Sequence, residues 1–284
     1  MTVKLITDST SYIDKKTLED LDITMIPLSV HFPDESFQET AVDYEYFYAK
    51  IASSGIIPSS SQPPQEELYN AFEKIISQGN EALGIFISKE MSGTYDSALK
   101  ARERILQKYP DAVIEVLNSG SNCMSLGFPV LEAARAALKG NPLHEVLATA
   151  RQTISRMHFY FVPVSLEYLR KGGRIGGAAA LLGSILNIKP ILFVNKEGKT
   201  DLLEKIRGSK AAINRLLSLL DKDFHTSGLK HVIVHHINAP EKARELARTI
   251  AARYSLDIPI TSIGPVIGLH VGPGTVGIVY CTQK

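Results

Sequence analysis

Cysteine is scarce in this chain, and the two that are present, Cys123 and Cys281, lie far apart in the sequence. Neither belongs to a Cys-x-x-Cys pair, which argues against a zinc site and excludes a disulfide framework. The histidines show no metal-ligand spacing either. His235 and His236 are adjacent on an expected strand, so their side chains would face opposite sides of it. The sequence therefore predicts no metal site.

An excess of charge of either sign is also missing. The formal net charge is +1. A nucleic-acid-binding protein usually carries a basic excess or stripe, and none is visible here. No nucleic-acid partner is expected, although the balance still allows a small basic patch.

No apolar run is long enough to suggest a membrane span. The most apolar stretch, Ile175–Val194, is interrupted by polar residues and a proline: Ser184, Asn187, Lys189 and Pro190. The first eight residues place a lysine inside a short apolar run, which is typical of a strand and not of a signal peptide. We expect a cytoplasmic protein without a transmembrane segment, and a transient contact with a membrane surface stays open.

The motifs of self-sufficient enzymes are absent as well. There is no GxxxxGK[ST] loop, no GxGxxG after an expected strand and no GxSxG nucleophile elbow. The sequence therefore predicts no catalytic residues and no cofactor. A stand-alone ester hydrolase or phosphotransferase remains an alternative that these absences disfavour.

The first half of the chain has the pattern of an α/β domain with a parallel sheet. The whole chain of 284 residues is 44% hydrophobic and 21% charged, which fits two packed globular domains. Short β-rich runs alternate with amphipathic stretches, and this alternation predicts parallel pairing. The expected strands are Val3–Thr7, Met25–Phe32, Ala82–Ser88 and Asp111–Leu117, and the expected helices are Lys15–Leu21, Tyr44–Ser53, Gln65–Gln78, Tyr95–Lys108 and about 127–138.

The second half indicates an α+β domain. Two long amphipathic helices are expected at Ser209–Leu220 and Pro240–Tyr254, and the end, Ile258–Thr282, reads as strand and glycine turn. The other expected strands are Phe159–Ser165, Ile188–Asn195, Leu202–Arg207 and His231–His236. We therefore place one domain at residues 1–155 and the other at 156–284.

Three hydroxyl-rich segments follow expected strands or open helices: Asp8–Thr10, Ser59–Ser61 and Ser92–Thr94. In parallel sheets, ligands bind at the loops beyond the carboxyl ends of the strands. Hydroxyls and free N–H groups at a helix start are the donors that a carboxylate needs. Serine and threonine are also preferred caps and turn residues, so a purely structural role is an open alternative for each segment. The serines of the second segment lie between Pro58 and Pro64, which predicts a loop.

Two further features could meet an anion. His270 lies in a glycine-rich segment, 264–274, and could donate one hydrogen bond or carry a positive charge. Residues 168–176 form a basic glycine-rich turn with Arg170, Lys171 and Arg174. The alternatives are a structural histidine and a solvated helix end favoured by the helix dipole.

Taken in order along the chain, these motifs resemble the DegV family, the fatty-acid-binding proteins of bacterial fatty-acid kinase. The matching segments are Ile6–Thr10, Ser60–Pro63, Ile87–Ala98, Tyr168–Gly176, Leu182–Ile191 and Gly264–Gly274. The resemblance implies a DegV-like two-domain fold with an α/β and an α+β domain. It also implies that the two domains form a lipid tunnel, with a long-chain fatty acid bound between them.

The resemblance also implies residue roles. It assigns the fatty-acid carboxylate to Ser60, Ser92 and His270, with Ser61 and Thr94 nearby, and it makes Arg174 a candidate for kinase docking. ATP and magnesium would belong to the partner kinase, and the product would be an acyl-phosphate for phospholipid synthesis. A carrier of another hydrophobic acid is the remaining alternative.

The chain departs from the family pattern in two places. The family often has threonine where this chain has Ser60, which keeps the hydroxyl. After the strand that ends near residue 117, the chain reads Asn118-Ser119 and then Cys123-Met-Ser-Leu-Gly127, where the family often reads Asp-Ser and then Ser-x-Gly. We expect this change to reshape one wall of the pocket. The small-residue run 176–180 either lets a ligand approach the backbone or serves ordinary packing.

Overall fold

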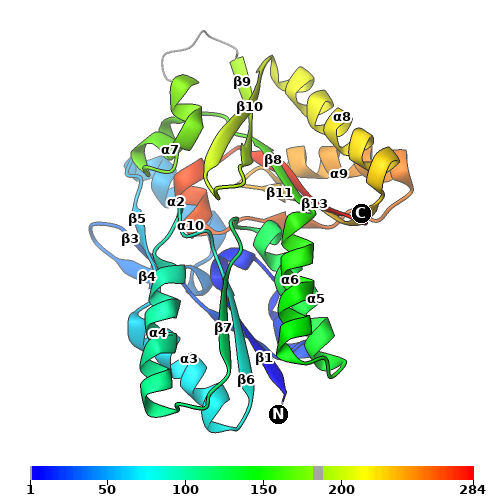
Figure 1. The fold of residues 1–284 in the computed structure, drawn as a ribbon. Helices are drawn as coiled ribbons and strands as arrows, with labels where there is room; N and C mark the ends of the chain where they lie inside the picture. The colour runs from blue at the N-terminus through cyan, green and yellow to red at the C-terminus, as the bar shows by residue number, and fades with distance from the viewer. Residues whose placement is uncertain (1, 182–187) are drawn as a thin grey trace. The chain divides into compact units, whose positions relative to one another are not determined.

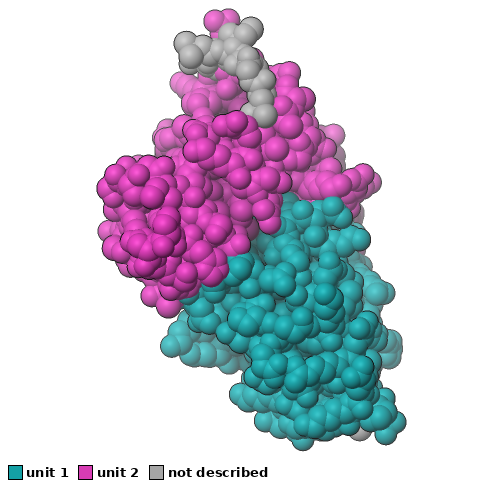
Figure 2. Space-filling view, turned by 90° about the vertical axis from the view of Figure 1, so that its left-hand side faces the viewer, with its two compact units in different colours: residues 1–29, 38–40, 61–155 teal, residues 30–37, 41–60, 156–284 magenta. Residues whose placement is uncertain are grey.

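The computed structural model describes residues 2–181 and 188–284. The chain forms two compact units, coloured separately in Figure 2. Unit 1 comprises residues 1–29, 38–40 and 61–155, and unit 2 comprises residues 30–37, 41–60 and 156–284. The chain leaves unit 1 for the last time between residues 155 and 156, which is where the sequence places the division between the two domains. Residues 30–37 and 41–60, expected in the first domain, cluster with unit 2.

Unit 1 is built on a four-stranded sheet with the order β2-β1-β6-β7. All three neighbouring pairs are parallel. The strands are β1 (Val3–Asp8), β2 (Ile23–Ile26), β6 (Glu81–Phe86) and β7 (Ile114–Asn118). The predicted α/β class and parallel sheet are therefore confirmed.

Helices cover both faces of this sheet. In Figure 1, α3 (Gln65–Ser77) and α4 (Thr94–Lys108) lie on one side, and α5 (Met124–Leu138) and α6 (Leu143–Ser155) lie on the other. The apolar residues of α3 at helical spacing are buried against the sheet, as Leu68 and Phe72 show with no exposed surface. The short α1 (Lys15–Asp20) leads into β2. Helix α6 was not anticipated from the sequence.

The expected strand Met25–Phe32 is broken in two. Pro27 follows β2, and the chain resumes as β3 (Ser29–His31), which belongs to a separate three-stranded sheet of order β4-β3-β5. Its other strands are β4 (Ser36–Gln38) and β5 (Ser59–Ser61). The expectation that residues 58–64 form only a loop was therefore wrong. Pairing with a neighbouring strand can hold a serine-rich segment extended although its composition favours a turn.

Unit 2 contains a six-stranded sheet of order β10-β9-β8-β13-β11-β12. Its pairs are antiparallel except for β11 with β12. This mixed sheet confirms the α+β character expected for the second half. The strands are β8 (Met157–Val162), β9 (Ile188–Val194), β10 (Thr200–Arg207), β11 (Leu229–His236), β12 (Ile260–Ser262) and β13 (Val276–Thr282).

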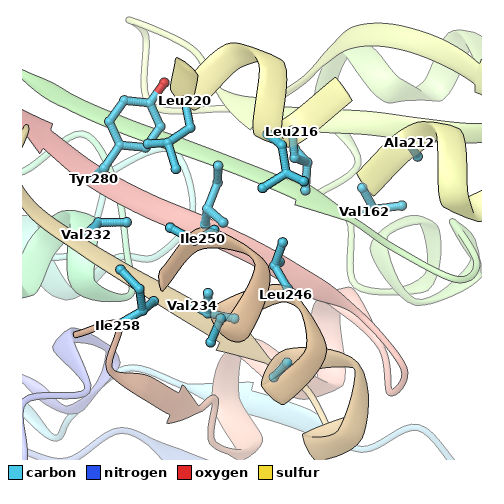
Figure 3. Packing of buried hydrophobic residues seen from close by; sticks show 14 of the residues in the cluster. Val162, Ala212, Leu216, Leu220, Val232, Val234, Leu246, Ile250, Ile258 and Tyr280 are labelled. Carbon is cyan, nitrogen blue, oxygen red and sulfur yellow. The ribbon is translucent and has the colours of Figure 1, made fainter. Parts of the chain in front are cut away.

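One face of this sheet is covered by the two long helices, α8 (Ser209–Ser227) and α9 (Pro240–Tyr254). Figure 3 shows Leu216 and Leu220 of α8 and Leu246 of α9 packed over Val234 and Tyr280 of the sheet. These side chains are almost completely buried. This cluster is the main core of unit 2.

The other face carries a smaller apolar cluster under short helices. They are α7 (Glu167–Lys171), the 3₁₀ helix η3 (Gly176–Leu181) and α10 (Pro265–Val271). Alternation along β8 places Phe161 in this cluster while Val162 belongs to the main core. Ala178 is buried in the same cluster, so the small-residue run contributes to packing. The longer α2 (Tyr44–Ser54) also belongs to unit 2.

Helix α10 corrects the expectation that residues 258–282 are almost all strand and turn. Pro265 stands at the first helical position, where its missing N–H costs nothing. Gly272 ends the helix with φ +95°, a conformation that favours glycine. A helix of seven residues is too short for a periodicity argument, so it was missed.

The segment Leu182–Ile191, which contributed to the family resemblance, is described in part. Residues 182–187 lie outside the described residues, and Ile188–Ile191 form the start of β9.

Candidate functional site

Two of the residues singled out from the sequence meet in unit 2. The Oγ atom of Ser60, on β5, lies 2.9 Å from Nε2 of His270, on α10. The two residues are separated by 210 positions in the chain. A serine hydroxyl and a histidine ring nitrogen at this distance form one polar pair.

Helix α10 is held in place by α2. The Tyr48 hydroxyl donates a hydrogen bond to the backbone carbonyl of Ile263 at 3.1 Å, just before the helix begins. A Cβ at Gly268 would lie 1.9 Å from this hydroxyl oxygen, so only glycine allows so close an approach. The position of His270 on the last turn of α10 is therefore tied to α2.

His270 is neutral at neutral pH. Burial, assisted by the positive charge of Arg174, lowers the pKa of His270 from 6.5 to about 4. Among the described residues, its second ring nitrogen, Nδ1, is buried without a hydrogen-bond partner. One ring nitrogen is thus engaged by Ser60 and the other by no polar group.

Gly172 explains how the ring is packed. A Cβ at Gly172 would lie 2.1 Å from His270 Nδ1, far closer than two non-bonded atoms can approach. The backbone after α7 therefore presses directly on the histidine ring. The glycine pair directly after Lys171 is a signal in the sequence that could have indicated such a close approach of the backbone to another group.

The Ser92–Thr94 turn lies in unit 1. Ser92 Oγ is 2.9 Å from Thr94 Oγ1, and the Thr94 N–H points to Ser92 Oγ at 3.4 Å. Helix α4 begins at Thr94, and no side-chain hydrogen bond caps it at Gly93. Ser92 is therefore not the N-cap residue, and the turn carries two hydroxyls beside a helix start.

The segment after β5 reaches this turn within unit 1. Gln62 Nε2 donates to Ser97 Oγ on α4 at 2.7 Å. A Cβ at Gly93 would lie 2.1 Å from Gln62 Oε1. Ser61, which precedes Gln62, is consequently anchored close to the start of α4.

The predicted carboxylate-binding residues thus fall into two groups. Ser60 and His270 are paired in unit 2, and Ser92 and Thr94 are paired in unit 1. Ser60 and Ser61 are consecutive residues at the passage from one unit to the other. Their role in binding a carboxylate stays a prediction.

The remaining hydroxyl-rich segment, Asp8–Thr10, is occupied by internal hydrogen bonds. Asp8 accepts hydrogen bonds from the Thr10 N–H at 3.0 Å and from the Ile87 N–H at 2.8 Å. The Ser9 hydroxyl donates to the buried carboxylate of Glu39 and accepts from the Leu28 N–H. Burial raises the pKa of Asp8 to about 6. This segment therefore stabilises unit 1 internally.

The loop after β7 contains polar atoms that sequence reasoning did not single out. Ser121 Oγ and Asn122 Oδ1 are buried without a hydrogen-bond partner among the described residues. Cys123 is buried with φ +53°, and burial raises the pKa of its thiol. Asn122 Nδ2 lies 3.0 Å from Met91 Sδ, next to the Ser92 turn. The only signal in the sequence was the departure from the family pattern at these positions.

Arg174 follows α7 and is exposed. Its Nη1 donates a hydrogen bond to the backbone carbonyl of Gly172 at 2.6 Å. This bond holds the guanidinium close enough to His270 for its positive charge to affect the histidine pKa. Lys171, on the last turn of α7, pairs with Glu167 at 3.0 Å. The basic turn therefore presents Arg174 outward, and its docking role stays a prediction.

Across residues 2–181 and 188–284, no three His, Cys, Asp or Glu side chains are grouped as ligands for a metal ion. No helix in the same residues combines the length and apolar character needed to cross a membrane.

A family model described as "Uncharacterised protein, DegV family" matches residues 2–283. The chain belongs to the DegV family. A DegV domain-containing protein of Clostridium acetobutylicum is 48% identical to it over 100% of this chain and 99% of that protein.

Solved DegV structures share the fold. DegV from Bacillus subtilis, a fatty-acid-binding protein, is 32% identical, with a TM-score of 0.86 over 99% of both chains. A fatty-acid-binding DegV family protein from Thermus thermophilus is 28% identical, with a TM-score of 0.89 over 99% of this chain and 100% of that one. The expected DegV-like two-domain fold is therefore confirmed.

Proposed function

We propose that this DegV-family protein binds one long-chain fatty acid and presents its carboxylate to a separate ATP-dependent kinase, which forms the acyl-phosphate. The fatty-acid-binding relatives support the ligand class. The observation in this chain that carries the proposal is the Ser60–His270 pair, because it is a ready hydrogen-bond donor group beside an apolar cluster.

The pair can grip a carboxylate without carrying a charge of its own. In the tautomer with a proton on Nε2, His270 donates to Ser60 Oγ, and the Ser60 hydroxyl proton is free for a carboxylate oxygen. A bound carboxylate also favours the imidazolium form, so its binding raises the pKa of His270 from its low value. The histidine thus orients Ser60 and responds to the ligand.

The acyl chain would lie against the smaller apolar cluster of unit 2. Five apolar side chains around this cluster are only partly buried: Phe159, Leu166, Ile175, Leu202 and Val271. Val271 directly follows His270, so the carboxylate donors and the apolar surface adjoin. Each buried methylene contributes about 0.8 kcal/mol, so a chain of ~15 methylenes gains on the order of 12 kcal/mol before association costs.

Ser61, Ser92 and Thr94 remain the proposed further donors. The hydroxyls of Ser92 and Thr94 are 2.9 Å apart and lie beside a helix start, where backbone N–H groups favour an anion. A carboxylate accepts on two oxygens, so more than one hydroxyl group can serve it.

A hydrolase would use Ser60 as a nucleophile and His270 as its base. In serine hydrolases the second ring nitrogen of the histidine is oriented by a carboxylate. Among the described residues, His270 Nδ1 has no hydrogen-bond partner, and a pKa of about 4 makes the ring a weak base. The geometry therefore favours ligand binding over hydrolysis.

The proposal is tested first by extracting freshly purified protein with organic solvent and identifying what is released. One equivalent of a long-chain fatty acid supports it, and the acyl type defines the specificity. Release of another hydrophobic acid would support the alternative carrier. An empty protein that also fails to bind added fatty acid refutes both.

Replacing Ser60 tests the carboxylate donor. Ser60→Ala removes the hydroxyl, and loss of a hydrogen bond to a charged group costs about 1.5–3 kcal/mol, so fatty-acid affinity should fall about tenfold or more. Ser60→Thr keeps the hydroxyl in a strand position and should bind nearly as the parent does. Competition with a fluorescent fatty acid measures both. Equal affinity of the alanine and threonine variants would remove Ser60 from the site.

Replacing Arg174 tests the proposed kinase step. We expect Arg174→Ala to retain fatty acid but to slow its phosphorylation by a DegV-partner kinase supplied with ATP and magnesium. Arg248→Ala, an exposed arginine on α9, is the matched control and should leave both properties unchanged. Equal loss of lipid binding and phosphorylation in Arg174→Ala would point to a folding defect in place of docking.

A further inference from the structure

Unit 2 contains a cavity of about 650 Å³ that lies away from the Ser60–His270 pair. It opens between the N-terminal halves of α8 and α9, on the sheet face that these helices cover. His270 and the smaller apolar cluster belong to the other face. The volume falls within the range of about 300–1,000 Å³ that is typical of small-molecule sites.

The inner part of the cavity is apolar. Val162 and Val276 come from the sheet, Leu217 from α8 and Leu246 from α9, and all four are buried. Ile213 adds a partly buried side chain on α8. An apolar group placed here would lose contact with water on several sides.

The outer part of the cavity is basic. It is lined by Lys189, Lys210 and Lys242 and by one carboxylate, Glu245, which leaves a net charge of +2. Lys189 Nζ reaches the carbonyl of Val164 at 3.4 Å.

Lys210 and Lys242 form no ion pair within 4.0 Å in the part of the chain that the structure describes. Lys50 of the same unit, by contrast, pairs with Asp34 at 2.8 Å and with Glu35 at 2.7 Å. Two ammonium groups at the cavity are thus available to an external anion.

The start of α8 adds backbone donors at the same rim. Its N-cap, Gly208, has φ +89° and no side chain with which to cap the helix. The first backbone bond of the helix runs from Ala212 N–H to Gly208 O. The N–H groups of Ser209 and Lys210 precede that bond, and both residues line the cavity.

We propose that this cavity binds a small organic phosphate, with its apolar part on the Leu217–Leu246 floor and its phosphate among the three lysines. A phosphate carries up to two negative charges, which matches the net charge of the rim. Lysine is a common phosphate partner, and a helix start favours the same ligand. The site is independent of the proposed fatty-acid function, because it uses the opposite face of the sheet.

The test is isothermal titration of the fatty-acid-loaded protein with 1-naphthyl phosphate. Two control compounds are titrated in parallel. Inorganic phosphate has the anionic group without the apolar ring, and 1-naphthalenemethanol has the apolar ring without the anionic group. We expect the naphthyl phosphate to bind at least about tenfold more tightly than either half.

Two variants locate the binding. Lys210→Glu with Lys242→Glu reverses the charge of the rim, and Asn214→Trp fills the cavity from an exposed position on α8 without changing charge. Each should weaken naphthyl phosphate binding by about tenfold or more. Lys205→Glu with Lys222→Glu makes the same charge change at exposed lysines elsewhere in unit 2 and should leave it unchanged.

The proposal is overturned if naphthyl phosphate shows no saturable binding, or if both cavity variants bind it as the parent does. Ser60→Ala separates the two functions. Naphthyl phosphate affinity that falls with Ser60→Ala would place the ligand in the fatty-acid site and refute the cavity assignment.

Discussion

His270 is held by one neighbour at each ring nitrogen. Ser60 forms the hydrogen bond to Nε2, and the bare backbone of Gly172 packs against Nδ1. A side chain at residue 172 would have to displace a ring that burial and α10 leave little room to move. Glycine is required here by close approach and not by backbone conformation, since φ at Gly172 is −76°.

Gly172→Ala should therefore displace the His270 ring and break its bond to Ser60. We expect fatty-acid affinity to fall by about tenfold, because the oriented donor is lost. Binding of a fluorescent fatty acid measures the effect, with circular dichroism as a check on folding.

Gly173→Ala is the matched control. Gly173 has φ +69° and open space at its Cβ position, so alanine there strains the backbone by about 1 kcal/mol without touching the ring. It should lower stability slightly and keep fatty-acid affinity. If both variants lose affinity alike, close packing of Gly172 on His270 is not the cause.

At the scale of elements, the two faces of the unit 2 sheet differ in how they are covered. Among the described residues, the long helices α8 and α9 cover a cluster of fifteen buried residues on one face, whereas the short helices cover a cluster of only four on the other. The first face thus provides most of the core of unit 2, and the second is the one on which we propose that the acyl chain binds.

Leu216→Ala tests this division. Leu216 has no exposed surface in the main core, so its truncation should lower the free energy of unfolding by about 2–5 kcal/mol. Urea unfolding followed by circular dichroism is the measurement, since the chain contains no tryptophan.

Leu256→Ala, at a residue that is 38% exposed, is the control and should change stability by less than about 0.5 kcal/mol. Fatty-acid binding by folded Leu216→Ala protein should be unchanged. A loss of affinity without a loss of stability would mean that the acyl chain uses the α8–α9 face.

At the scale of the whole molecule, three buried groups connect stability with pH. Burial lowers the pKa of His235 and of His270 from 6.5 to about 4 and raises the pKa of Asp8 from 3.8 to about 6. Below about pH 6.5 the unfolded chain takes up protons on the two histidines that the folded chain does not, so stability falls as the pH falls toward 4. Asp8 acts in the opposite direction, because the folded chain holds its proton between about pH 6 and 4.

We predict that the parent loses stability between pH 6.5 and 4 and that His270→Gln loses less. Each buried histidine contributes a slope of up to about 1.4 kcal/mol per pH unit in that window. Urea unfolding at a series of pH values gives the slopes. His144→Gln, at an exposed residue, should retain the parent slope. An unchanged slope in His270→Gln would show that His270 is not titrating as its burial requires.

The sequence by itself determined the layered architecture and the family. Alternation of β-rich runs with amphipathic stretches predicted the parallel sheet, because hydrophobic period and chain order decide which faces must be buried. Prediction from the hydrophobic pattern failed for elements that are too short to show a period. A three-residue strand at Ser59–Ser61 and a seven-residue helix at Pro265–Val271 are decided by their neighbours, and α6 was overlooked.

Only the tertiary structure decided which functional residues meet. Nothing local relates Ser60 to His270 across 210 positions, and the pair depends on α10 being docked by Tyr48 and Gly172. The low pKa of His270 likewise follows from burial, as does the cost of leaving Asn122 Oδ1 without a hydrogen-bond partner among the described residues, and the sequence does not state burial. Composition and period act along the chain, whereas desolvation and close approach depend on what the fold brings together from distant parts of it.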